Sequence, residues 1–114
     1  MSQQWDSEFA AALQDATRPV PGLVCEPDAG LPRLFWQDDP RGAYTVQAGL
    51  VARSDGEPDV LHAWAVIHYL REREAGGTFE RDEYALDAQD TGTRVPAVVA
   101  ALVVAAVVHH HTVV

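Results

Sequence analysis

The chain has 114 residues, 47% of them hydrophobic, and its 17 acidic and 8 basic residues give a formal net charge of −9. This length predicts a single domain, residues 1–114, large enough to bury a hydrophobic core. All the basic residues are arginines, so the sequence excludes lysine-based Schiff-base chemistry and a P-loop, and the acidic balance argues against a nucleic-acid partner because phosphate binding needs a basic surface.

Cysteine usage and the N-terminal sequence favour a cytoplasmic protein. Cys25 is the single cysteine and cannot form an internal disulfide. The first residues, MSQQWDSE, have neither the basic nor the apolar region of a secretory signal. The lack of asparagine and the many alanines, valines and arginines suggest a GC-rich bacterial source. We therefore expect a bacterial cytoplasmic protein without a membrane partner.

The N-terminal half predicts one helix followed by short strands. Ser2 to Ala16 is expected to be an amphipathic helix, since its apolar residues recur at helical spacing. Leu23 to Glu26 and Arg33 to Gln37 are expected strands, bounded by proline, glycine and aspartate. The turn residues of Asp38 to Gly42 then predict a hairpin that returns the chain as a strand over Ala43 to Arg53. One face of that strand carries Tyr44, Val46, Ala48, Leu50 and Ala52.

The segment from Pro58 to Glu74 is predicted to be a central helix. Pro58 and Asp59 suit a first helical turn, Arg71 and Arg73 suit the last, and Gly76-Gly77 would end it. Its apolar residues cover most of the helix surface, and Trp64 and Ile67 are expected to face a sheet.

The apolar surface of the predicted central helix is wider than one small sheet can cover. Its remaining apolar side therefore needs either the C-terminal segment or a second subunit as cover. In the second case we expect an interface at Leu61, Ala65, His68 and Tyr69.

The C-terminal part is less regular. Phe79 to Gly92 fits neither the helical nor the strand period, and a short strand at Tyr84 to Ala88 is the preferred interpretation. Val95 to Val108 is too short to span a bilayer, which needs about 20 apolar residues. Its grouped valines favour a buried helix capped by Thr93, while the valine content leaves a buried strand open. The fold class is therefore α+β, with an antiparallel sheet of three to five strands packed against the central helix and with N- and C-terminal helices.

The histidines and the cysteine do not form a recognisable catalytic or metal-binding pattern. On a helix, His109-His110-His111 would point about 100° apart, and on a strand only the first and third share a face. His62 and His68 are not at the i, i+4 spacing of a helical zinc motif. Cys25 lies in no nucleophile motif and is expected to be a structural, buried residue.

The carboxylate groups also have simple explanations. Asp55, Glu57 and Asp59 alternate like the start of a calcium loop, but the glycine and the bidentate glutamate of that loop are absent. Asp38-Asp39 fits turn chemistry, and it could act as an acid or metal pair only if other loops converged on it. We therefore assign no catalytic, cofactor-binding or metal-binding residues and no cofactor.

The segment from Leu31 to Gly77, with LFWQDDPRGAYTVQAGL leading into DVLHAWAVIHYLREREAGG, resembles in layout the secretion-chaperone-like fold shared by type III secretion chaperones and the YbjN family. The resemblance implies a homodimer whose exposed apolar faces bind an extended polypeptide without catalysis. These families have no invariant catalytic motif, so the resemblance transfers no site residues.

We therefore expect a non-enzymatic, chaperone-like homodimer that binds another polypeptide. One alternative is a small enzyme that uses a metal ion or a Cys/His pair, drawing on Cys25, the histidines or Asp38-Asp39. A second alternative, suggested by the charge of −9 alone, is an acidic inhibitor that mimics nucleic acid.

Overall fold

A computed structural model describes residues 3–26, 31–52 and 61–113 of the chain. Two helices flank five strands in the sequence. The elements in chain order are α1 (Gln3–Thr17), β1 (Leu23–Glu26), β2 (Arg33–Trp36), β3 (Asp39–Ala52), β4 (Leu61–Ala75), β5 (Thr78–Asp90) and α2 (Pro96–Val113). The protein is thus an α+β chain with one antiparallel sheet, as the sequence predicts.

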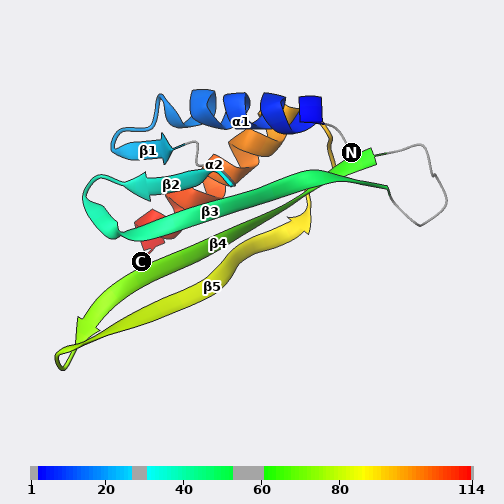
Figure 1. Cartoon of the computed structure of the whole chain (residues 1–114). Helices are drawn as coiled ribbons and strands as arrows, with labels where there is room; N and C mark the ends of the chain where they lie inside the picture. Colours follow the sequence, from blue (N-terminus) through cyan, green and yellow to red (C-terminus); the bar gives the residue numbers. More distant parts are fainter. Residues whose placement is uncertain (1–2, 27–30, 53–60, 114) are drawn as a thin grey trace.

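The five strands form a simple meander in the order β1-β2-β3-β4-β5, and every neighbouring pair is antiparallel. Both helices lie on the same face of this sheet, with α1 against β1 and β3 and α2 against β4 and β5 (Figure 1). On the other face, which we call the open face, no described helix lies (Figure 1).

The hydrophobic core lies between the sheet and the two helices. Because side chains alternate along a strand, Val46 of β3 and Ile67 of β4 both point to the helices and pair directly across the two strands. Trp5 of α1 stacks on Phe9 and donates its indole N–H to the carbonyl of Arg94, 2.7 Å away, just before α2. The helices therefore pack on each other as well as on the sheet.

The central helix predicted for residues 58–74 is wrong, because residues 61–75 form strand β4. Ala63, Ala65, Ile67 and Tyr69 are buried at every second position, which is the period of a strand. Trp64, which the helix would have placed beside Ile67, lies on the open face and is 39% exposed. Hydrogen bonding to β3 on one side and β5 on the other outweighs the local helix signals.

Smaller differences concern the first hairpin. Strand β3 already begins at Asp39, so the turn consists of Gln37 and Asp38 and not of residues 38–42. Gly42 belongs to the strand, where a Cβ atom would lie 2.6 Å from the hydroxyl of Tyr69. This glycine is needed for close packing and not for a turn.

The C-terminal part of the chain forms one long strand followed by a helix, so the alternative of a buried strand at residues 95–108 does not hold. The expected strand at 84–88 is the middle of β5, which starts at Thr78. Helix α2 begins at Pro96 and continues through the histidines to Val113. Val95 occupies the N-cap position, because its carbonyl accepts the N–H groups of Val98 and Val99. The expected cap by Thr93 is therefore wrong: Thr93 Oγ1 accepts a hydrogen bond from the backbone N–H of Val95, at 3.1 Å, in the turn before the helix.

Strands β4 and β5 extend beyond the rest of the sheet as a two-stranded arm, residues 71–83 (Figure 1). The pairing of β3 with β4 ends at Arg71, whereas β4 and β5 remain paired up to Ala75 and Thr78. Gly76 and Gly77 close the arm with φ values of 61° and 85°, which glycine adopts without strain. The arm contributes to the elongated shape, with extents of 54 × 29 × 28 Å.

Candidate functional site

A cluster of three tyrosines and one histidine fixes the C-terminal end of α2 to the sheet. The hydroxyl of Tyr44 lies 2.7 Å from Nδ1 of His110, and the hydroxyl of Tyr84 lies 2.8 Å from Nε2 of the same ring. The ring of Tyr69 packs against the imidazole, with centroids 4.5 Å apart. Adjacent strands position the tyrosines, since Tyr44 pairs with Tyr69 and Tyr69 pairs with Tyr84.

The hydrogen bonds and burial both suit a neutral imidazole. A neutral ring donates from one nitrogen and accepts at the other, so one tyrosine hydroxyl accepts while the other donates. Burial lowers the pKa of His110, and the neighbouring His111 and His109 lower it further. Burial likewise raises the pKa of Tyr44 to about 12. The cluster is therefore a structural contact that favours the neutral forms of His110 and Tyr44.

This arrangement predicts a stability that depends on pH. The pKa of His110 is lower in the folded chain than in the unfolded chain, where a histidine has a pKa of about 6.5. The free energy of unfolding should therefore decrease as the pH falls from about 7 through the lowered pKa of His110, because protonation then favours the unfolded state. Urea denaturation at a series of pH values measures this effect. The slope should be smaller in His110→Gln than in the control His109→Gln, and equal slopes in the two variants would contradict the assignment.

The three consecutive histidines have three different environments. His109 is exposed, His110 is buried, and His111 stacks on Trp36 with ring centroids 4.1 Å apart. His111 Nε2 also lies 3.5 Å from a carboxylate oxygen of Asp38. Within the described residues, no group of three histidine, cysteine or acidic side chains could hold a metal ion.

The other candidate catalytic residues do not converge. Cys25 is partly buried, and burial raises the pKa of its thiol, which disfavours the nucleophilic thiolate. Asp39 forms an ion pair with Arg71, so it does not form a carboxylate pair with Asp38. His62 lies on the open face of β4. Asp55, Glu57 and Asp59 lie outside the described residues.

The residues expected at an interface between chains lie on both faces of β4. Ala65 and Tyr69 are buried against the helices of the same chain, whereas His68 is exposed on the open face. The side chain of Leu61 lies outside the described part of the structure. The interface at these four residues stays a prediction, and a strand does not place them on one surface.

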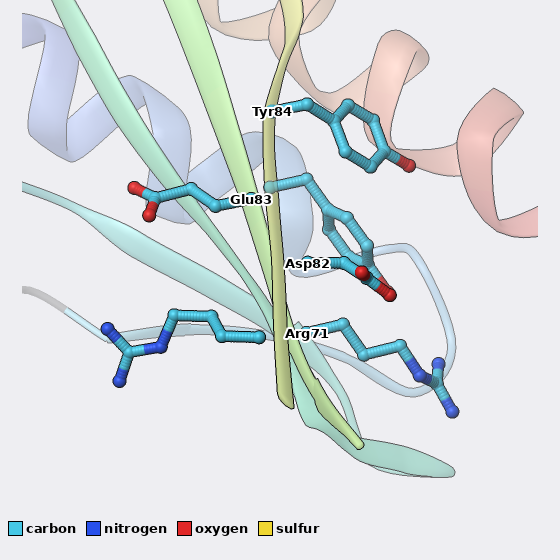
Figure 2. A pocket seen from close by; sticks show the side chains of 6 residues that line it. Arg71, Asp82, Glu83 and Tyr84 are labelled. Atoms are coloured by element: carbon cyan, nitrogen blue, oxygen red, sulfur yellow. The ribbon is translucent and has the colours of Figure 1, made fainter. Parts of the chain in front are cut away.

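The outer edge of β5 is a surface that no described strand covers. The sheet ends at this strand, so its outer edge pairs with no described strand along 13 residues. Glu80, Arg81, Asp82 and Glu83 are all exposed there, as are the rings of Phe79 and Tyr84. An open hollow of about 780 Å³ adjoins this stretch, and Figure 2 shows Tyr84, Asp82 and Arg71 on one side of β5 and Glu83 on the other.

Ion pairs join β4 and β5 in the arm, but Glu83 takes part in none of those described. Arg73 lies 2.9 Å from Glu80 and 3.4 Å from Asp82, on the helix-covered face. Arg81 lies 3.4 Å from Glu72 on the open face. Glu83 forms no ion pair within the described part of the chain.

The outer face of α2 is another surface that no described element covers. Residues on the other side of the helix, including Val99, Val103 and Val107, are buried in the core. The outward side is apolar as well, and no charged residue occurs between positions 95 and 108. Its exposed residues are Val95, Ala97, Val98, Ala101, Leu102 and Ala105. At 18 residues and a mean hydropathy of 1.7, α2 has the length and composition of a membrane span, although core helices of soluble proteins also meet this criterion.

The described residues thus form a small α+β chain in which no described element covers the outer edge of β5 or the outer face of α2. Comparisons with family models, with curated proteins and with solved structures find no match.

The sequence reasoning missed both the tyrosine-histidine cluster and the outer edge of β5. Neither has a local motif, because the cluster joins residues from β3, β4, β5 and α2. A signal for the cluster was nevertheless present, since Tyr44, Tyr69 and Tyr84 each belong to a segment that a three-stranded meander could align.

Proposed function

We propose that the chain is a non-enzymatic, chaperone-like homodimer of the bacterial cytoplasm that binds another polypeptide. The observation that carries this proposal is the apolar outer face of α2. A helix that is apolar all round is normally covered on all sides, but the described part of the chain leaves Val98, Leu102 and the alanines beside them exposed on α2. Another polypeptide chain is the simplest cover for such a face.

A second copy of the chain fits this face better than other occupants. The charge of −9 opposes the approach of two copies, but the outer face of α2 contains no charge and can meet itself without repulsion. Ala101 and Ala105 lie one turn apart in its middle, where small side chains let two helices approach closely. The net negative charge also disfavours binding to anionic membranes.

Substitution of Leu102 by glutamate tests the dimer. Leu102 is 45% exposed in the single chain, so the substitution should not disturb the core. In a dimer it would bury two unpaired carboxylates, and we expect the dissociation constant to rise by about 100-fold or more. Sedimentation equilibrium measures this constant. Leu31→Glu is the control, because Leu31 has a similar exposure of 40% and lies outside α2.

Two results would contradict the α2 dimer. One is a wild-type chain that remains monomeric at high concentration. The other is a monomer that sediments with neutral phosphatidylcholine vesicles, since α2 would then bind lipid and not a second copy. Binding of a polypeptide is tested separately with fluorescently labelled, reduced and carbamidomethylated α-lactalbumin, a permanently unfolded chain whose blocked cysteines add no charge. We expect saturable binding, and its absence would contradict the polypeptide-binding function.

A further inference from the structure

We propose that the outer edge of β5 binds a basic, extended segment of the partner polypeptide, which pairs with β5 as an additional strand. This inference rests on the proposed polypeptide binding and names the chemistry of the segment that is bound.

The first argument is that the outer edge of β5 pairs with no described strand. In an edge strand, alternate N–H and C=O groups point away from the sheet and can pair with another extended chain. Strand β5 offers such an edge over residues 79–90, whereas β1, at the other side of the sheet, has only four residues. A strand of 13 residues is long enough to bind a peptide mainly through its backbone.

The second argument is the charge of the edge. Strand β5 contains five acidic residues and one basic residue, so it carries −4 of the total formal charge of −9. Two copies of β5 would repel each other if they paired edge to edge, which disfavours the second copy as the occupant. A basic segment would be attracted by the same charges.

The third argument is that β5 presents a carboxylate and an aromatic ring on each of its two faces. Tyr84 and Asp82 lie on the helix-covered side, beside the hollow, and Glu83 lies on the opposite side (Figure 2). Phe79 also belongs to the open face, because it pairs with Glu74 of β4, and it is 81% exposed. The side chains of an added strand alternate between the two sides, so arginines on either side would meet a carboxylate and an aromatic ring.

Labelled peptides of nine residues test the proposal with the full-length protein. The peptides share threonine and valine at six positions and carry arginine, serine or glutamate at the other three. Fluorescence anisotropy at low and at physiological salt gives the dissociation constants. We expect the arginine peptide to bind at least about tenfold more tightly than the glutamate peptide, with a difference that decreases as salt is added.

Two controls separate strand addition from simple attraction of charges. An arginine peptide that is N-methylated at alternate residues keeps its charge but cannot form a complete ladder of hydrogen bonds, and we expect it to bind at least about tenfold more weakly. Glu83→Arg should weaken binding of the arginine peptide about fivefold. Glu74→Arg is its matched control. It makes the same change in charge on the same face of the arm, also at a residue without an ion pair in the described structure, but on β4, and it should have little effect.

The outcomes distinguish this inference from the proposed function. Equal binding of the three peptides, equal binding of the N-methylated peptide, or equal effects of Glu83→Arg and Glu74→Arg would each overturn the β5 site. If the unfolded α-lactalbumin still bound in those cases, the polypeptide-binding function would stand and its site would lie elsewhere. If neither α-lactalbumin nor any peptide bound, both proposals would be wrong.

Discussion

Substitution of Ile67 by alanine is expected to lower the free energy of unfolding by about 3 kcal/mol, whereas Trp64→Ala should lower it by about 1 kcal/mol or less. Ile67 is 1% exposed in the core, and its truncation leaves a cavity between the sheet and the helices. Trp64 is 39% exposed on the open face, so its truncation removes less buried surface. Urea denaturation followed by circular dichroism measures both values at one protein concentration, since dimerisation would contribute to stability.

This comparison tests whether residues 61–75 form a strand. On a helix, positions three residues apart share a face, so the two substitutions would have similar costs. On a strand the two side chains point to opposite faces. A larger loss of unfolding free energy for Trp64→Ala than for Ile67→Ala would therefore contradict the assignment of residues 61–75 to a strand.

Substitution of His110 by alanine is the second change with a large expected effect. It removes a buried ring and leaves the hydroxyl of Tyr44 without its partner, so we expect a loss of about 2–4 kcal/mol. His109→Ala, one residue away on the exposed side of α2, should change the free energy by about 0.5 kcal/mol or less. Urea denaturation at pH 7.5 provides both values, and similar losses in the two variants would show that the cluster does not hold α2 on the sheet.

The two tyrosine hydroxyls bonded to His110 should contribute unequally. Tyr44 is 2% exposed and Tyr84 is 46% exposed. Tyr44→Phe leaves a buried ring nitrogen of His110 without a hydrogen-bond partner, so it should cost more stability. After Tyr84→Phe, water can replace the lost hydroxyl. A double-mutant cycle with His110→Ala separates the energy of each hydrogen bond from the effect of burial.

The resemblance to the secretion-chaperone-like fold was based on a layout with a helix after the third strand. The observed order is helix, five strands, helix, and the segment DVLHAWAVIHYLREREAGG contributes β4. The outer face of α2 supports the proposed homodimer, and the outer edge of β5 supports the proposed polypeptide partner, both of which the resemblance also implied. These surfaces make the proposals testable without the resemblance.

Local sequence determined the elements in which apolar residues recur at a regular spacing. Helix α1 has a polar and an apolar side and β3 alternates, so both follow from this spacing. For α2 the sequence favoured a helix but left a buried strand open.

Only the tertiary structure decided that residues 61–75 form a strand and not a helix. A nearly continuous apolar run fits a buried helix and a buried strand equally well, and Gly76-Gly77 fits both a helix end and a hairpin turn. Pairing with β3 and β5, which are distant in sequence, selects the strand. The same applies to the three histidines, which are identical locally. Only the packing of α2 on three tyrosine-bearing strands makes His110 a buried contact and leaves His109 in solvent.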